Sequence, residues 1–142
     1  IQGVSGPTLC SSLYETEPVD TPEGSMSFLN AVMEVEFSGS PDGLLNSLQT
    51  IESAMGRPSQ RPVNAPRVID LDILYAADSV LALPHLMLPH PRLHQRRFVL
   101  APLAEILPNL RLPGFEITVG ELLNILQDPA TVERASQQWK TL

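Results

Sequence analysis

The sequence predicts an α+β chain in which short strands alternate with helices. Apolar and polar residues alternate over residues 9–15, 29–37 and 65–75, which is the period of a half-buried strand. Apolar residues spaced three and four apart over 44–55 indicate an amphipathic helix. The chain has 142 residues, of which 43% are hydrophobic, and this suffices for the core of one domain. A single domain over residues 1–142 is therefore expected.

Composition and charge narrow the class of protein. The single cysteine, Cys10, cannot form a disulfide within the chain, which favours a reducing cytoplasm over secretion. The sequence has no apolar run of about 18 residues and no signal-peptide pattern, so no membrane association is expected. The net charge of −7 argues against nucleic-acid binding. Small molecules are the expected partners.

The segment before residue 57 predicts a loop and a capped helix. Residues 17–27 are rich in Pro, Gly, Ser and acids, which is typical of an exposed loop. Ser40, followed by a proline, predicts the start of a helix, and Gly56 predicts its end. Gln49 and Glu52 lie three residues apart on a second face of this helix, which is either available to a ligand or simply solvated.

Two carboxylates interrupt the apolar strand expected over Ala65–Tyr75. Asp70 and Asp72 are two residues apart, so a strand places them on one face, while the apolar residues between and around them face the other side. Like charges held this close repel each other, and a hard divalent cation with oxygen ligands relieves the repulsion. The alternative is an ordinary strand with a polar outer face.

The second half of the chain predicts shorter elements. Residues 79–83 read as a strand, and residues 94–106 as a helical stretch interrupted at Pro102. Thr118 and the glutamate three residues after it have the spacing of a capping box, which predicts a further helix. The tail, residues 131–142, is expected to be a short helix or frayed.

Arginines surround the acidic pair. Six of them lie between residues 57 and 97, namely Arg57, Arg61, Arg67, Arg92, Arg96 and Arg97. Arginine suits phosphate oxygens, so arginines beside a carboxylate metal site indicate a polyphosphate ligand. The alternative is that they pair with the acidic first third of the chain. No glycine-rich phosphate loop occurs, which excludes P-loop ATPases and protein kinases.

The three histidines give a weaker signal. His85, His90 and His94 could suggest zinc, but no thiol or helical histidine pair completes such a site. His90 lies between two prolines near the arginines, which favours a hydrogen bond to phosphate.

The order of these motifs resembles that of the 6-hydroxymethyl-7,8-dihydropterin pyrophosphokinases of folate biosynthesis. The resemblance covers residues 11–110 and includes the runs Ser11–Pro18, Pro66–Leu74, Pro89–Pro91 and Arg96–Leu100. It implies a ferredoxin-like α/β sandwich with a mainly antiparallel sheet covered by helices. It also implies a magnesium-dependent enzyme that transfers the β,γ-diphosphate of ATP to the hydroxymethyl oxygen of the pterin and releases AMP. A monomer is expected.

The resemblance assigns roles to residues of this sequence. Asp70 and Asp72 would hold two magnesium ions, and Arg57, Arg67 and Asp72 would be catalytic. The expected nucleotide contacts are Gln49, Glu52, Arg57, Arg67, Ile73, His90 and Arg96. The expected pterin contacts are Thr16, Val19, Phe28, Asn30 and Phe98, with the two phenylalanines on either side of the ring and Asn30 at its polar edge. Ordinary core packing is the alternative for both phenylalanines.

The sequence also departs from the family pattern. The usual first strand and helix do not precede Ser11, and residues 1–10 read as the loop that leaves that helix. Ser59, Val63 and Asn64 stand where arginines and an aromatic residue are common, and His85 stands where an arginine is common. Two alternatives remain open, namely another magnesium-dependent nucleotidyl or glycosyl transferase and a non-catalytic protein that binds nucleotide.

Overall fold

The structure is a computed structural model, and it describes residues 3–16, 28–56, 69–129 and 131–135. Contacts between Cα atoms divide the chain into two compact units, of which unit 1 comprises Ile1–Val4 and Phe37–His90 and unit 2 comprises Ser5–Glu36 and Pro91–Leu142. The described residues contain helices and antiparallel strands, as the sequence predicts. The single domain stays a prediction, and the loop expected over 17–27 lies outside the described residues.

The helix of unit 1 begins and ends where the sequence predicts. Helix α1 (Pro41–Ala54) has Ser40 as its N-cap, and the Ser40 side chain accepts a hydrogen bond from the Gly43 backbone N–H at 3.1 Å. Gly56, just after the helix, has a φ of 105°, a left-handed value that glycine adopts without strain. Both signals are local, which explains why the sequence alone places this helix correctly.

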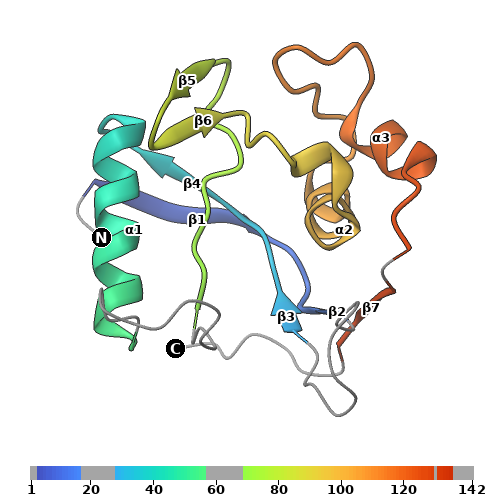
Figure 1. Cartoon of the computed structure of the whole chain (residues 1–142), viewed down its shortest axis with the longest axis horizontal. Coiled ribbons are helices and arrows are strands. Elements are labelled where there is room, and N and C mark those ends of the chain that lie inside the picture. Colours follow the sequence, from blue (N-terminus) through green and yellow to red (C-terminus); the bar gives the residue numbers. More distant parts are fainter. Residues whose placement is uncertain (1–2, 17–27, 57–68, 130, 136–142) are drawn as a thin grey trace. The chain divides into compact units, whose positions relative to one another are not determined.

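A hairpin completes the core of unit 1. Strands β5 (Leu81–Leu83) and β6 (Leu86–Leu88) pair antiparallel, with Leu81 opposite Leu88. Figure 1 shows this hairpin beside the first turn of α1. The hairpin contributes Leu86 and Leu88 to an apolar cluster with Ile73, against which Leu44, Leu45, Leu48, Ala76 and Leu81 pack. The strand expected over 79–83 is therefore confirmed only from Leu81 onward.

The acidic segment is not a regular strand. Residues 69–76 take no strand conformation, and residues 65–68 lie outside the described part of the chain. The expected alternation of burial is nevertheless present, since Asp70 and Asp72 are exposed while Ile73 is buried. The strand prediction is wrong because the pattern reports burial and not backbone pairing. In place of a strand ladder, the Leu71 N–H donates to the Glu52 side chain, and the carbonyls of Leu74 and Ala76 accept from the backbone N–H groups of His90 and Ser79.

Strands β1 (Val4–Cys10) and β4 (Met33–Phe37) form a two-stranded sheet. The sequence predicts a loop over residues 1–10, and this is wrong for Val4–Cys10. The segment overlaps the predicted strand only at Leu9 and Cys10, and its other residues have no apolar alternation to reveal a strand. Its backbone pairs with β4 all the same, because a partner strand can override weak local preference.

A second sheet in unit 2 has the order β3-β2-β7, with β2 (Tyr14–Thr16) pairing antiparallel to β3 (Phe28–Asn30) and β7 (Val132–Arg134). Each of the two strands predicted over 9–15 and 29–37 is in fact divided between the two sheets. Both predicted strands are interrupted between the two sheets, near Ser11 and Val32. There the Ser11 backbone N–H donates to the Val32 carbonyl at 2.8 Å, and the Val32 N–H donates to the Ser11 hydroxyl at 2.9 Å.

The tail contains a strand where a helix or fraying is predicted. Residues 132–134 form β7, and the Ala135 backbone N–H donates to the Leu13 carbonyl at 2.8 Å. Residues 136–142 lie outside the described part of the chain. The prediction fails because β7 is stabilised by pairing with β2, which is more than 100 residues away in sequence.

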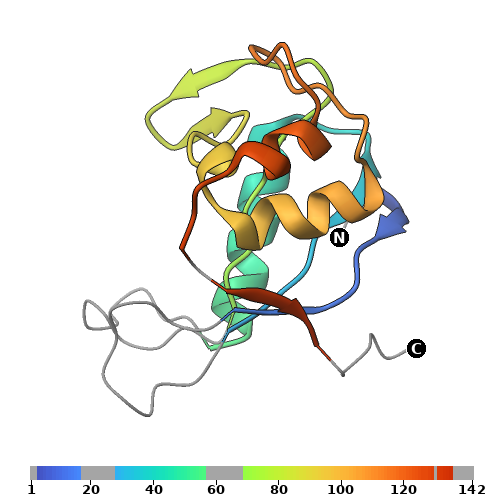
Figure 2. The ribbon, with the colours of Figure 1, turned by 90° about the vertical axis from the view of Figure 1, so that its right-hand side faces the viewer.

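Helix α2 (Arg97–Ile106), preceded by the 3₁₀ turn η1 (Leu93–Gln95), continues through Pro102. The predicted interruption is therefore wrong. A proline inside a helix removes one hydrogen bond at a cost of about 3 kcal/mol. Here Pro102 is buried together with Leu100 and Leu103, and their packing offsets that loss. Figure 2 shows α2 lying between α3 and β7.

Helix α3 (Val119–Ile125) confirms the predicted capping box. The Thr118 hydroxyl accepts from the Glu121 backbone N–H at 3.2 Å, and the Glu121 carboxylate accepts from the Thr118 backbone N–H at 3.0 Å.

Among the residues that the structure describes, α1 is the longest helix at 14 residues, and none of the helices has the length and apolar character that a membrane span requires.

Candidate functional site

The acidic pair of unit 1 has the exposure that a cation site requires. Asp70 and Asp72 are both exposed, and Ile73 next to them is buried in the apolar cluster. The described residues contain no group of three or more His, Cys, Asp or Glu side chains that could hold a metal ion. Magnesium commonly binds through one or two carboxylates and completes its shell with water and substrate phosphates. The donor set therefore fits magnesium better than zinc, which needs more protein ligands.

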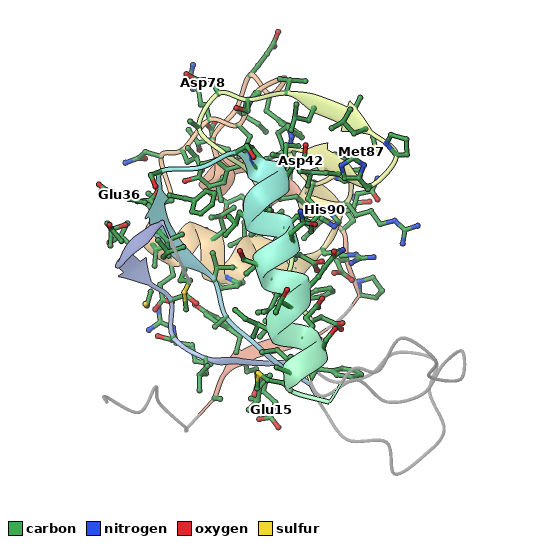
Figure 3. All side chains as sticks on the ribbon, turned by 90° about the vertical axis from the view of Figure 1, so that its left-hand side faces the viewer. Glu15, Glu36, Asp42, Asp78, Met87 and His90 are labelled. Atoms are coloured by element: carbon green, nitrogen blue, oxygen red, sulfur yellow. The ribbon has the colours of Figure 1, made fainter. Side chains whose placement is uncertain are left out.

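Two hydrogen bonds fix the backbone around this pair. The Leu71 N–H, between the two aspartates, donates to Oε2 of Glu52 at 2.9 Å. Three residues further along, the Leu74 carbonyl accepts from the backbone N–H of His90 at 2.8 Å. The structure thus brings together the predicted nucleotide and metal residues Glu52, Asp70, Asp72, Ile73 and His90, and Figure 3 labels His90.

The predicted pair on α1 has two different environments. Gln49 is exposed, as expected for a side chain available to a ligand. Glu52 is only 6% exposed and binds Leu71, so the alternative of a solvated face is wrong for Glu52. A buried carboxylate is uncommon without hydrogen-bond donors, because it loses the hydration that water provides.

The predicted basic residues are only partly within the described chain. Arg57, Arg61 and Arg67 lie outside the described residues, as does Val19. Arg96 is half-buried just before α2, and its guanidinium carbon lies 5.5 Å from the centre of the Phe98 ring, which is a cation–π distance.

Arg97 has a structural partner in unit 2. Its backbone N–H donates to Oδ2 of Asp128 at 2.9 Å, and its guanidinium donates to the carbonyls of Leu126 and Asp128, each at 3.3 Å. These contacts tie the start of α2 to the segment after α3. They differ from the predicted alternative, in which the arginines pair with the acidic first third of the chain.

Three predicted pterin residues of unit 2 lie on one face of the β3-β2-β7 sheet. Thr16 pairs with Phe28 in the register, and Asn30 lies two residues further along β3, on the same face as Phe28. The Asn30 amide donates to the Thr16 hydroxyl at 3.2 Å. Phe98 lies in the first turn of α2, a helix that contacts both β2 and β3.

Core packing does not explain the position of Phe28. Phe28 is 61% exposed, so it does not belong to the buried core. The alternative of ordinary core packing is therefore wrong for Phe28, whereas Phe98 is half-buried and consistent with either role. An exposed aromatic face next to a threonine and an asparagine offers both stacking and hydrogen bonding to a flat heterocycle.

Comparison with known proteins gives the family. Residues 3–108 match the family described as 7,8-dihydro-6-hydroxymethylpterin-pyrophosphokinase. The chain belongs to this family. The match includes the acidic segment, α1, the hairpin and all of α2, whereas α3 and β7 lie beyond it.

Relatives of the pyrophosphokinase family support the same conclusion. The chain is 46% identical over 100 residues to the 2-amino-4-hydroxy-6-hydroxymethyldihydropteridine pyrophosphokinase of Bacillus subtilis, with 70% of this chain and 58% of the relative covered. The protein of the same name from Methylorubrum extorquens is 43% identical over 107 residues, with 75% and 65% covered. The folic acid synthesis protein fol1 of Schizosaccharomyces pombe is 44% identical over 119 residues, with 82% of this chain and 16% of the relative covered. The chain thus spans about three fifths of the length of the two bacterial pyrophosphokinases.

His85, where the family pattern favours an arginine, has a defined partner. It lies in the turn between β5 and β6, and its Nε2 is 2.7 Å from Oδ1 of Asp42. Figure 3 shows Asp42 at the first turn of α1. Both side chains are more than half exposed, at 58% for His85 and 52% for Asp42, so the pair contributes little to stability.

A polar network in unit 2 was not apparent from the sequence. The Glu105 carboxylate of α2 accepts from the Ser12 backbone N–H at 2.6 Å and from the Ser12 hydroxyl at 2.7 Å, and it lies 3.1 Å from the Arg134 guanidinium. Tyr14 is buried beside it. The network joins α2 to β2 and β7 across more than 90 residues of sequence, so no local pattern could reveal it.

The network shifts the pKa values of its ionisable members, Tyr14, Glu105 and Arg134. Burial raises the pKa of the Tyr14 hydroxyl above its ordinary value. Burial also acts to raise the pKa of Glu105, but the two hydrogen bonds from Ser12, the charge of Arg134 and the Tyr14 hydroxyl outweigh it and hold that pKa below its ordinary value. A carboxylate with a lowered pKa stabilises the folded state above its unfolded pKa and loses this effect as the pH falls through its folded pKa.

Replacing Glu105 with glutamine is therefore expected to lower the free energy of unfolding at pH 7 by about 1–2 kcal/mol, because the charged hydrogen bonds from Ser12 are weakened. Arg134 adds little because its side chain is 64% exposed. Urea unfolding followed by circular dichroism at several pH values checks this. The difference in free energy of unfolding between the wild type and Glu105→Gln should shrink as the pH falls below about 4.5, the ordinary pKa of glutamate. A difference that is constant with pH would contradict the assignment.

Proposed function

We propose that the chain transfers the β,γ-diphosphate of ATP to the hydroxymethyl oxygen of 6-hydroxymethyl-7,8-dihydropterin, giving the pterin diphosphate and AMP in folate biosynthesis. Membership of the pyrophosphokinase family supports this. The observation that carries it is the exposed pair Asp70 and Asp72 on a segment whose backbone is fixed by Glu52 and His90.

Unit 1 supplies most of the described residues proposed for ATP. Asp70 and Asp72 would hold two magnesium ions. Bound there, magnesium would supply positive charge that neutralises the polyphosphate oxygens. Gln49 and His90 lie in the same unit and can donate hydrogen bonds to the nucleotide. The Ile73 side chain is buried, so its contribution to ATP binding is assigned to its backbone.

The chemistry requires no covalent intermediate on the protein. The pterin hydroxymethyl oxygen attacks the β-phosphorus, the bond between this phosphorus and the oxygen that bridges to the α-phosphorus breaks, and AMP leaves with that oxygen. The hydroxyl proton passes to solvent. Because charge shifts toward the leaving oxygen, guanidinium groups that contact the phosphates stabilise the transition state. Arg57, Arg67 and Arg96 are the residues proposed for this role.

Unit 2 supplies the described residues proposed for the pterin. Phe28 and Phe98 would stack on the two faces of the ring, and Asn30 and Thr16 would bind its polar edge, with Val19 as a further contact. Arg96 lies over Phe98, which places a residue proposed for ATP beside one proposed for the pterin. The hydrogen bond between the Asn30 and Thr16 side chains, beside the exposed Phe28 on the same face of the sheet, supports this assignment.

The remaining expectations accompany the proposed activity. The ferredoxin-like sandwich is the arrangement proposed for the whole fold, and a monomeric single domain is proposed because no partner chain is needed to supply the residues above. A cytoplasmic location fits a reaction that consumes ATP, and the unpaired Cys10 fits a reducing compartment.

The activity is tested by incubating the 142-residue chain with ATP, magnesium and the hydroxymethyl pterin, and by separating the nucleotides. The proposal predicts AMP, and not ADP, in an amount equal to the pterin diphosphate formed. ATP with magnesium but without the pterin is the control and should release no AMP. Release of ADP, or AMP formation that does not depend on the pterin, would reject the proposal in favour of another transferase.

Replacing Asn30 with alanine is expected to raise the KM for the pterin about 5–50-fold, because one or two hydrogen bonds to the ring edge are lost. The KM for ATP should stay unchanged. Steady-state kinetics with each substrate varied in turn checks this. The exposed Glu15, the neighbour of Thr16 that faces the other side of the sheet, gives a matched control as Glu15→Ala. Equal effects on both KM values would count against a pterin-specific role for Asn30.

A further inference from the structure

Glu52 has a carboxyl group in a place that is unfavourable for a negative charge. It is 6% exposed and lies in the last turn of α1, where the negative end of the helix dipole repels a carboxylate. An apolar side chain would fit this position at lower cost in hydration. A functional or structural requirement for an acceptor at this point would explain its presence.

The described partner of Glu52 is the backbone of the acidic segment. Its Oε2 accepts from the Leu71 N–H at 2.9 Å, across 19 residues of sequence. The Leu71 N–H belongs to the peptide unit that joins Asp70 to Leu71, so this bond holds the backbone between the two aspartates and limits how their side chains are oriented. The segment has no strand conformation over residues 69–76, and bonds of this kind take the place of a ladder in holding it.

The other end of the segment is fixed separately. Ile73 is buried in the apolar cluster of unit 1, and the Leu74 carbonyl accepts from the His90 N–H at 2.8 Å. These contacts hold the chain after Asp72. The Glu52 bond acts between the aspartates, and so it sets the spacing of their carboxylates more directly than the contacts that follow.

A direct role as a third metal ligand is not supported. Glu52, Asp70 and Asp72 all lie in the part of the chain that the structure describes, and they do not form a group that could hold a metal ion. One oxygen of Glu52 is already bound to Leu71. The geometry therefore separates Glu52 from the exposed carboxylates and links it to them through the backbone.

We infer that Glu52 is a positioning residue, which holds Asp70 and Asp72 in the orientation that binds the magnesium complex of ATP by accepting the Leu71 N–H. This rests on the proposed function, and it differs from the nucleotide contact that the resemblance implies for Glu52. The side chain at position 52 must then place an acceptor oxygen within hydrogen-bonding distance of the Leu71 N–H, and its charge is secondary.

Two substitutions distinguish the effect of the length of the Glu52 side chain from the effect of its charge. Glu52→Gln keeps the length of the side chain and an acceptor oxygen but removes the charge. Glu52→Asp keeps the charge but shortens the side chain by one methylene, so that its oxygens no longer reach Leu71. Ser53→Ala, at the exposed neighbouring position on α1, is the matched control. Glu52→Ala removes both properties, and the Gln and Asp variants decide the question if the Ala variant does not fold.

The first measurement is hydrogen exchange at the Leu71 amide, which needs no ligand. The inference predicts slow exchange in the wild type, Glu52→Gln and Ser53→Ala, and faster exchange in Glu52→Asp. The second is the magnesium concentration required for half-maximal ATP binding, measured by calorimetry. It should rise about tenfold in Glu52→Asp, as for other residues that orient metal ligands, and stay near the wild-type value in Glu52→Gln. The KM for the pterin should not change in either variant.

The results that overturn the inference are distinct from those that overturn the function. If Glu52→Gln requires as much magnesium as Glu52→Asp, the charge is what matters and the positioning role is wrong. It is equally wrong if Glu52→Asp exposes the Leu71 amide without changing the magnesium requirement. In both cases the wild type still binds magnesium and ATP, and the proposed function stands. If the wild type shows no magnesium-dependent ATP binding, the proposed function and the role of Glu52 both fall.

Discussion

Replacing Asp72 with alanine is expected to lower kcat by at least about 10²–10³-fold, the range seen when one electrostatic contact to the transition state is removed. Asp72 is exposed beside the buried Ile73, so the substitution removes a carboxylate without opening a cavity in the apolar cluster. The free energy of unfolding should therefore stay nearly unchanged. Rapid-quench measurement of AMP formation at saturating ATP and pterin checks the effect on kcat.

Asp78 provides the matched control for this experiment. It is an exposed aspartate six residues further along the chain, outside the predicted metal site, and Figure 3 shows it. Asp78→Ala removes the same charge and should leave kcat unchanged. If Asp72→Ala retains turnover near that of the wild type, or if the two variants lose activity equally, the assignment of Asp72 as a metal ligand is rejected.

Replacing Leu100 with alanine is expected to lower the free energy of unfolding by about 2–5 kcal/mol. Leu100 is 0% exposed and lies in α2, the helix that contacts α3 and all three strands of the β3-β2-β7 sheet. The substitution removes apolar contacts and leaves a cavity that the surrounding helices and strands cannot fill. Because whole domains are stable by only about 5–15 kcal/mol, the midpoint of urea unfolding should fall clearly.

Ile125→Ala is the control for the core substitution. Ile125 ends α3 and is 66% exposed, so a change there should stay within about 0.5 kcal/mol of the wild type. Similar losses from Leu100→Ala and Ile125→Ala would show that α2 is not the centre of the apolar core of unit 2.

The features that the sequence predicts correctly depend on neighbouring residues. Ser40 and Gly56 mark the ends of α1, and Thr118 with Glu121 forms the predicted capping box. The exposure of Asp70 and Asp72 beside the buried Ile73 also follows from a local alternation. Each of these signals acts within a few residues, so it can be recognised without knowledge of the fold.

The features that the sequence misses depend on distant partners. Strand β7 and residues 4–8 of β1 carry no local strand signal, and the two strands are stabilised by pairing with β2 and β4, respectively. The alternation over 65–75 indicates burial correctly but gives the wrong backbone conformation for residues 69–76, because the hydrogen bonds come from Glu52 and His90. The network around Glu105 requires Ser12 and Arg134 to come together from opposite ends of the chain. Tertiary contacts, which no short window of sequence contains, decide all of these.

The candidate site likewise has features that the sequence predicts and features that only the structure reveals. The motif that contains Asp70 and Asp72 is specific enough to indicate the family, and the family match over residues 3–108 agrees with this. The exposure of Phe28 and the bond between Asn30 and Thr16 appear only when β2 and β3 are paired in their register. The burial of Glu52 could not be foreseen, because a glutamate near the end of a helix is most often solvated.

Binding of ATP with and without magnesium, measured by calorimetry for the wild type and for a variant with both Asp70→Asn and Asp72→Asn, tests the central claim most directly. If the aspartates hold magnesium against the polyphosphate, magnesium tightens ATP binding to the wild type and has no such effect on the variant. ATP without metal should bind the variant at least as well as the wild type, because two repelling charges are gone. An equal gain from magnesium in both proteins would contradict the claim.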